Sequence, residues 1–431
     1  MERTAAMASL NRREFIGGAV AATGLIGTVS AGDGGDKPLK LALIGCGWYG
    51  MVNVDAAFKA GGVQVTAVCD VDTAHLKDSA DKIEPRQGFR PKLFADYRAL
   101  LDNCAADAVI IATPPQWHAL MFIDALAKGF DIYCEKPLSY DVREGQAMVH
   151  AAQKAQRIVQ IGFQRRKSKA IQQAREFIRG GGIGKVVQAD VQIHYAAGLR
   201  DTTVKAPPET LDWDAWCGPA PKLPYCEQIG HFAWRLEKEY GHGHLVDWGI
   251  HLIDATRWIL DEDMPSSVQA AGGIYYFKDK ITTPDVLTAQ FDFATCPVVW
   301  RHRIWGAEEY TPEVANGIFL YGDKGTVFVT DNRWVLINKG KNADRKVTEV
   351  KADMAVDHMQ EFLDAVRTRK QPICTTADGH KSTATVKLAM IALQAGRKIT
   401  WDPDQKQIVN DPEAANLLKR PYRPPYKHPH S

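Results

Sequence analysis

Short apolar runs alternate with helical stretches over the first half of the chain, and this alternation limits the fold more than any other feature. Strands are expected at residues 40–44, 64–69, 107–112, 131–134 and 158–161, and helices at 51–60, 119–128 and 143–155. The run at 107–112 is apolar throughout, as in a strand that is buried on both faces. Strict alternation of strands and helices favours a parallel, doubly wound α/β sheet.

A glycine loop lies between the first expected strand and its helix. Its sequence is Gly45-Cys46-Gly47-Trp48-Tyr49-Gly50. Gly45 permits a tight turn, Gly47 lets the backbone approach a pyrophosphate, and Gly50 lets the helix pack close to the strand. Such a loop is weak evidence alone, but Asp70 ends the next strand, twenty positions after Gly50. A carboxylate there accepts hydrogen bonds from ribose hydroxyls and repels a 2′-phosphate, so we predict a Rossmann domain over residues 38–163 that binds NAD rather than NADP. Asp72 is the alternative ribose ligand.

The second half of the chain has a different pattern. Residues 186–194 alternate, with Val187, Ala189, Val191 and Ile193 on the expected buried face, and residues 286–293 alternate in the same way. This pattern is typical of a sheet that is covered on one face only. Further strands are expected at residues 272–277, 298–304, 317–321 and 326–330.

We therefore predict an α+β domain over residues 164–405, with a large, mostly antiparallel, open-faced sheet. The half-polar face of this sheet suits pairing into a homodimer or homotetramer. A long insertion at residues 197–240 is rich in Trp, Pro and charge, and loops of this length are usually functional. Residues 406–431 are expected to form an extended arm that packs on a neighbour or is disordered.

Length and charge exclude several classes of protein. A chain of 431 residues is too long for one ordinary core, which favours two domains. A net charge of +2 without a long basic run gives no reason to expect nucleic acid. The eight cysteines form no C-x-x-C pair, so a zinc or thioredoxin-type site is not suggested.

Two short segments carry groups that are suited to proton transfer and charge stabilisation. Lys136, in Cys134-Glu135-Lys136-Pro137, follows an expected strand at the sheet edge where ligands bind, and its ammonium can stabilise an alkoxide. Asp247 and His251 are four apart, so on a helix they share one face. A histidine oriented by a carboxylate is a suitable proton acceptor. Taken singly, Lys136 is equally well explained as a surface lysine, and His251 better as a buried helix histidine.

Three segments of the chain, by their order and spacing, resemble those of the Gfo/Idh/MocA oxidoreductases. They are the glycine loop, the E-K-P segment, and the D-x-G-x-H-x-x-D segment from Asp247 to Asp254. The resemblance continues at residues 358–366 and 395–403 and covers nearly all of the chain after the N-terminal segment. It implies that Lys136, Asp247 and His251 are the catalytic trio and that the Lys136–Pro137 bond is cis.

The resemblance implies further site residues. Those assigned to the cofactor are Gly45, Cys46, Gly47, Trp48, Tyr49, Gly50, Asp70, Thr113, Pro114, His118, Glu135, Lys136 and Gln164. Those assigned to the substrate on the resemblance are Arg165, Trp234 and Arg235, and His244 is added because it lies close to Asp247 and His251 in the sequence. The family's glycine turn is usually Gly-Gly-Gly, whereas this chain has Gly241-His242-Gly243 followed by His244. His244 and His251 are seven apart, which stretches the geometry of a shared metal site, so we predict no metal.

The implied activity is reversible hydride transfer between a nicotinamide cofactor and a hydroxyl carbon of a sugar, glycoside or cyclitol. One alternative is a redox-neutral glycosidase that oxidises C3 transiently and eliminates the aglycone. The other is a non-catalytic binding protein on the same fold, against which the intact trio argues.

Residues 1–31 are predicted to be a twin-arginine signal peptide. Arg12 and Arg13 precede a weakly apolar, glycine-rich stretch, and Val29-Ser30-Ala31 offers a cleavage site. The alternative is a disordered, mildly apolar N-terminus. No other segment approaches the ~20 apolar residues of a transmembrane helix, so none is expected after signal removal. Export predicts a periplasmic protein. Because free NAD is scarce outside the cytoplasm, we expect its cofactor to be tightly bound.

Overall fold

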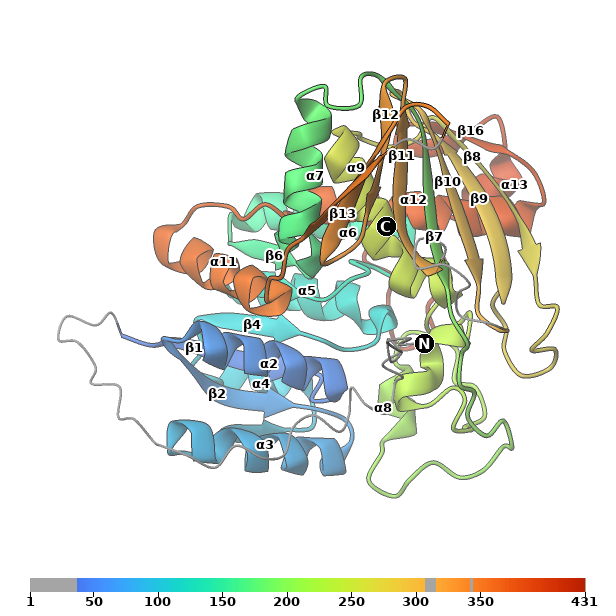
Figure 1. The fold of residues 1–431 in the computed structure, drawn as a ribbon. Helices are drawn as coiled ribbons and strands as arrows, with labels where there is room; N and C mark the ends of the chain where they lie inside the picture. Colours follow the sequence, from blue (N-terminus) through green and yellow to red (C-terminus); the bar gives the residue numbers. More distant parts are fainter. Residues whose placement is uncertain (1–36, 307–314, 342–343, 431) are drawn as a thin grey trace, which may run out of the picture. The chain divides into compact units, whose positions relative to one another are not determined.

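The computed structural model of the chain describes residues 37–306, 315–341 and 344–430 (Figure 1). The predicted twin-arginine segment therefore lies outside the described residues. In the part that is described, no helix combines the length and apolar character needed to cross a membrane.

A six-stranded parallel sheet forms the first half of the fold, in the strand order β3-β2-β1-β4-β5-β6. Its strands are β1 (Leu39–Ile44), β2 (Val63–Cys69), β3 (Lys92–Phe94), β4 (Ala108–Ile111), β5 (Asp131–Cys134) and β6 (Val159–Ile161). This order is that of a Rossmann domain, which confirms the predicted doubly wound sheet. β3 was not expected, because it has three residues and none of them is buried.

Helices cover both faces of this sheet, and every side chain of β1 from Leu41 to Ile44 is therefore buried. Leu41 and Leu43 pack with helices on one face, while Ala42 and Ile44 pack with helices on the other. The first group comprises α2 (Trp48–Ala60), α3 (Thr73–Gln87) and α11 (Met354–Thr368). The second comprises α4 (Tyr97–Asn103), α5 (His118–Ala127) and α6 (Val142–Ala155). Helix α11 thus returns from far along the chain to complete the first domain.

The second sheet has ten strands in the order β14-β13-β12-β11-β7-β10-β9-β8-β15-β16. They are β7 (Val186–His194), β8 (Ser267–Gly273), β9 (Val286–Asp292), β10 (Pro297–Arg303), β11 (Asn316–Gly322), β12 (Gly325–Val329), β13 (Arg333–Asn338), β14 (Arg345–Glu349), β15 (Ile399–Asp402) and β16 (Gln407–Val409). The β7–β10 pair is parallel and the other described pairs are antiparallel. The predicted mostly antiparallel sheet is confirmed.

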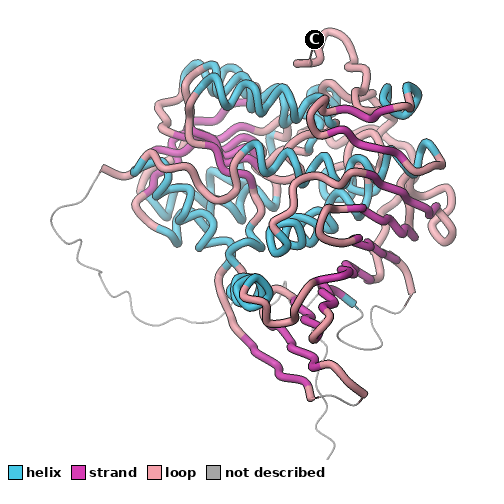
Figure 2. The backbone as a smooth tube through the Cα atoms, turned by 90° about the horizontal axis from the view of Figure 1, so that it is seen from above, coloured by secondary structure: helices cyan, strands magenta, loops and turns pink. Residues whose placement is uncertain are grey.

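Helices α7 (Lys169–Arg179), α9 (Ile250–Leu260) and α12 (Thr376–Ala395) pack on the strands of this sheet. The view in Figure 2 shows helices lying beside strands in the described part of the chain. The other face carries alternating exposed side chains along β8, β9 and β10, as expected for an open-faced sheet. That this face pairs subunits stays a prediction.

Two details of the expected strands are wrong. Val187 was placed on the buried face of β7, but it is 51% exposed. The reason is an irregularity in β7 itself: Tyr321 and Gly322 of β11 pair with Gln188 and Val186, so Val187 is an extra, unpaired residue and the alternation changes at the start of β7. The strand expected at 272–277 instead covers Ser267–Gly273, and β13 to β16 were not expected.

The C-terminal segment is ordered on its own chain. After the short helix α13 (Pro412–Asn416), Tyr422 donates to Glu144 Oε1 at 2.7 Å and His428 Nε2 lies 3.0 Å from Asp141 Oδ2. Asp141 and Glu144 form the capping box that begins α6. The expectation of a disordered arm is therefore wrong.

A buried ion pair ties the first domain to the helices of the second. Arg166 follows β6 and donates to both carboxylate oxygens of Asp254 on α9, at 2.8 and 2.6 Å. Ser382 on α12 donates to the same carboxylate at 2.6 Å. Both charged side chains are almost fully buried, and Arg166 also pairs with Asp378 on α12, so protein partners take the place of water around this cation.

We predict that Asp254→Ala lowers the free energy of unfolding by about 3–5 kcal/mol, because it leaves the Arg166 cation buried without its main partner. Urea unfolding of the full chain measures this value. Asp78→Ala, which breaks the exposed pair with Lys82, is the matched control and should cost less than about 1 kcal/mol. Equal losses of unfolding free energy for the two variants would contradict the view that Asp254 is the main partner of the buried Arg166 cation.

Candidate active site

The glycine loop forms a cradle at the beginning of α2. Gly45 has φ +95°, and a Cβ there would lie 2.7 Å from the backbone of Ala112. A Cβ at Gly50 would overlap the carbonyl oxygen of Gly45. At Gly47, however, a Cβ would meet nothing within 4 Å. The backbone at Gly47 therefore borders open space in front of a helix N-terminus, where a pyrophosphate fits.

Asp70 lies beside this loop, as predicted. Its two carboxylate oxygens accept hydrogen bonds from the amides of Cys46, at 2.7 Å, and Asp72, at 2.9 Å. Asp72 has other partners: it caps α3 through the amide of Ala74, and its second oxygen lies 2.8 Å from His231 Nε2. Asp70 is the better placed ribose ligand, because it is bonded to the glycine loop itself, whereas Asp72 is bonded to α3 and to the insertion.

The carboxylate of Asp247 is held between two cations. Lys136 Nζ donates to Asp247 Oδ1 at 2.9 Å and to its carbonyl oxygen at 2.7 Å. Arg235 Nε lies 3.0 Å from Asp247 Oδ2. Burial alone would raise the pKa of Asp247, but the Lys136 and Arg235 cations outweigh it and lower this pKa to about 2. The Lys136–Pro137 peptide is cis, as the resemblance implies.

The expected pairing of Asp247 with His251 is wrong. Asp247 lies in a π-helical turn, η4 (Leu245–Gly249), and His251 follows in α9, so the i,i+4 spacing does not span one regular α-helix. Both oxygens of Asp247 are taken by Lys136 and Arg235, and His251 Nδ1 has no hydrogen-bond partner among the described residues. Burial, with the cations of Lys136 and Arg165, lowers the pKa of His251 well below its usual value. The ring is therefore neutral at neutral pH and able to accept a proton.

Glu135 is buried behind Lys136. Its Oε1 accepts from Asn53 Nδ2 and from Gln164 Nε2, both at 3.0 Å. Burial raises the pKa of Glu135 to about 7, although Lys136 and Asn53 act against this rise. Gln164, which was assigned to the cofactor, thus positions Glu135. Asn53 was missed, and no pattern in the sequence marks it.

His118 also has a supporting role rather than direct access to a cofactor. Its ring is fully buried, with Nδ1 2.8 Å from the carbonyl oxygen of Pro137 and Nε2 2.8 Å from that of Thr113. The expectation that His118 lines the nicotinamide side is corrected: it fixes the segments that carry Thr113 and Pro137.

The four residues assigned to the substrate divide into two groups. Arg235 contacts Asp247, and His244 is buried, with its ring 4.7 Å from that of Tyr195. Arg165 instead pairs with Asp331 at 2.9 Å, and Trp234 packs on an aromatic cluster within the insertion. Tyr195 was not predicted as a site residue, and neither was His302, whose ring lies 5.1 Å from that of His244. His302 shares the inward face of β10 with Val298 and Trp300, so a polar residue on an apolar face was the available signal.

Several buried polar atoms around the trio have no hydrogen-bond partner among the described residues. They are Gln164 Oε1, Arg165 Nη1, His244 Nε2 and His251 Nδ1. Buried polar atoms are nearly always satisfied in native proteins, so a group of unsatisfied ones indicates a site for a polar ligand. Together with the open space at Gly47, they fit a dinucleotide and a hydroxyl-rich substrate.

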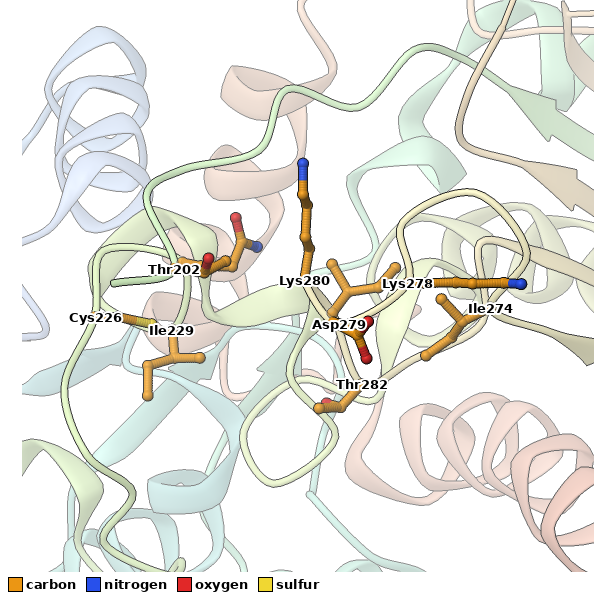
Figure 3. A pocket seen from close by; sticks show the side chains of 10 residues that line it. Thr202, Cys226, Ile229, Ile274, Lys278, Asp279, Lys280 and Thr282 are labelled. Carbon is orange, nitrogen blue, oxygen red and sulfur yellow. The ribbon is translucent and has the colours of Figure 1, made fainter. Parts of the chain in front are cut away.

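A separate hollow of about 580 Å³ lies between the insertion and the segment that precedes β9. Thr202, Cys226 and Ile229 line one side of it, and Lys278, Asp279, Lys280 and Thr282 the other (Figure 3). Lys136, Asp247 and His251 do not line this hollow, so it is separate from the site that they form.

Comparison with known proteins identifies the family. Residues 39–163 match the model of an oxidoreductase family with an NAD-binding Rossmann fold, and residues 183–428 match the C-terminal alpha/beta domain of the same family. The chain belongs to the Gfo/Idh/MocA oxidoreductases. It is therefore an NAD-binding enzyme of a family that acts on CH–OH groups.

Named relatives of this Gfo/Idh/MocA protein are distant. The inositol 2-dehydrogenase of Salmonella paratyphi B is 32% identical over 227 residues, which cover 52% of this chain and 55% of the relative. A solved oxidoreductase from Agrobacterium radiobacter, in complex with NAD+, L-tartaric acid and magnesium, has a TM-score of 0.65 at 20% identity, over 84% of this chain and 98% of that one. The aldose–aldose oxidoreductase of Caulobacter crescentus has a TM-score of 0.66 at 19% identity, over 84% and 99%. At these identities the solved structures establish the fold alone.

The buried carboxyl of Glu135 gives a pH prediction. Its folded pKa of about 7 exceeds its ordinary value of 4.5, so the folded state binds a proton more tightly than the unfolded state. The stability that this group contributes is complete below pH 4.5 and is lost as the pH rises through 7. Glu135→Gln, which keeps an acceptor for Asn53 but no charge, should therefore be about 2–3 kcal/mol more stable than the wild type at alkaline pH.

Urea unfolding of nucleotide-free protein at mildly acidic and alkaline pH measures the difference between the two proteins. The surface substitution Glu176→Gln on α7 is the control and should show no pH-dependent gain. If Glu135→Gln is no more stable than the wild type at the alkaline pH, the carboxyl is not held in a costly environment.

Proposed function

We propose that this protein catalyses reversible hydride transfer between NAD and a hydroxyl carbon of a sugar or cyclitol. The observation that carries the proposal is the Lys136–Asp247 ion pair at the sheet edge, with a neutral His251 one turn further along the chain. Lys136 supplies a fixed cation and His251 a proton acceptor, and the oxidation of an alcohol requires both.

Lys136 and His251 have different roles in the proposed reaction. Lys136, held by Asp247, donates a hydrogen bond to the reacting oxygen and stabilises negative charge as it develops there. His251, whose ring is neutral, accepts the hydroxyl proton. Bound NAD supplies the hydride acceptor. In the reverse direction His251 returns the proton to the carbonyl oxygen.

The polar surroundings support a substrate with several hydroxyl groups. His244 Nε2 and Arg165 Nη1 are buried without partners among the described residues, and each is a donor or acceptor for a hydroxyl. The relatives' names point the same way, since they include an inositol 2-dehydrogenase and an aldose–aldose oxidoreductase.

Lys136→Met should lower kcat by a factor of about 10²–10³, because it removes the cation that faces the developing charge. NADH formation at 340 nm, with a panel of polyols, aldoses and glycosides, measures the rate. Lys128→Met, which removes an exposed lysine of the same domain, is the matched control and should leave kcat unchanged. If Lys136→Met retains more than about a tenth of the wild-type kcat, Lys136 is not the stabilising group.

A redox-neutral glycosidase is the second candidate, and His244 favours it. Elimination of an aglycone needs a proton acceptor and a proton donor, and this chain has a second buried histidine, His244, beside the trio. Release of a chromogenic aglycone without net NADH would select the glycosidase, whereas net NADH from a free polyol selects the dehydrogenase.

We also propose that the protein is exported through the twin-arginine route and works in the periplasm. The Arg12-Arg13 pair and the apolar stretch after it support this proposal. Cell fractionation of the wild type and of the Arg12→Lys, Arg13→Lys double variant tests it: the wild type should be periplasmic and the variant retained. Equal distributions would refute it.

A further inference from the structure

The insertion between β7 and the glycine turn is anchored on the first domain at two places. After β2, the amide of Thr73 donates to the carbonyl of Thr210 at 2.9 Å, and Asp212 donates to that of Val71 at 3.0 Å. After β4, Trp117 Nε1 donates to the carbonyl of Ala215 at 2.9 Å. Both anchors lie at the carboxyl ends of parallel strands, which is the edge where a dinucleotide binds.

One short segment of the insertion, η3 (His231–Leu236), runs from the ribose end of that edge to the reaction centre. His231 Nε2 lies 2.8 Å from Asp72 Oδ2, two residues beyond the ribose ligand Asp70. The ring of Phe232 contacts that of Trp48, in the glycine loop, with centroids 5.4 Å apart. Arg235 Nε reaches Asp247 at 3.0 Å.

The order of these contacts along η3 matches the order of parts in a dinucleotide. His231 lies at the adenosine ribose end, Phe232 at the helix N-terminus that receives the pyrophosphate, and Arg235 at the trio where the nicotinamide reacts. We propose that η3 is a clasp that covers the bound dinucleotide, so that the cofactor leaves only when the His231–Asp72 and Phe232–Trp48 contacts open. The proposal rests on NAD binding and not on the identity of the substrate.

The contacts suit a clasp because they lie across the edge of the site and not deep in the core. Trp48 is 58% exposed and Phe232 41% exposed, although their rings touch. Such a pair is strong enough to slow departure of a ligand and weak enough to open. A cofactor held in this way is reduced and reoxidised in place by two successive substrates.

The release rate of NADH tests the clasp directly. Full-length protein is loaded with NADH and chased with excess NAD+, and the loss of bound-NADH fluorescence gives the rate constant. Phe232→Ala and His231→Ala should each accelerate release at least about fivefold, the value expected when one such contact is lost. Phe89→Ala, which removes a similarly exposed phenyl ring (37%) from the first domain, and His150→Ala on the exposed side of α6 are the matched controls.

Release within about twofold of the controls for both variants would overturn the proposal, because a clasp must slow departure. A second measurement uses the unaltered chain and does not depend on the folding of a variant. Saturating NAD+ should slow tryptic cleavage at Arg200, Lys205, Lys222 and Arg235 of the insertion. Cleavage at the same rate with and without NAD+ would equally overturn it.

Discussion

The ion pair of Lys136 with Asp247 is the interaction on which the rest of the site depends. Lys136 follows β5 of the parallel sheet, Asp247 lies in η4 before α9, and Arg235 joins them from the insertion. One carboxylate therefore links η3 and η4 to the end of β5, which lies 111 positions earlier in the sequence at Lys136. The two cations keep this carboxylate ionised, since they lower its pKa although burial would raise it.

Around this pair, other buried polar groups fix the backbone and do not react. His118 links the carbonyls of Thr113 and Pro137, and Gln164 with Asn53 holds Glu135 under Lys136. Each of these groups is costly to bury unless it is bonded, so each specifies one arrangement of the strand ends. The reacting groups are thereby held by a rigid shell, while η3 supplies the part that must open.

Strong local patterns made much of the fold predictable. The glycine loop with Asp70, and the apolar runs of β1, β2, β4, β5 and β6, depend on neighbours in sequence and were located almost to the residue. β3 and β16 have three residues each, too short for a period to be recognised. Val187 was misplaced because it is an extra residue in the pairing of β7 with β11, and that register does not show in the sequence of β7.

Local sequence patterns were also not enough to predict how the site residues contact one another. The order of three motifs predicted Lys136, Asp247 and His251 as site residues. It did not predict that Asp247 pairs with Lys136 and not with His251. The partner of Asp247 depends on a π-turn and on Arg235, which approaches from the insertion through the tertiary fold. His118 was misassigned because its sequence position next to the nicotinamide loop does not reveal that its ring turns inward to two carbonyls.

A crystal structure of the full chain with NAD+ tests the central claim most directly. The account predicts the pyrophosphate at Gly47, the adenosine ribose hydrogen-bonded to Asp70, and the nicotinamide ring against Lys136 and His251, beneath a closed η3. A dinucleotide whose nicotinamide lies away from Lys136 would contradict the assignment of the Lys136–Asp247 pair as the reaction centre.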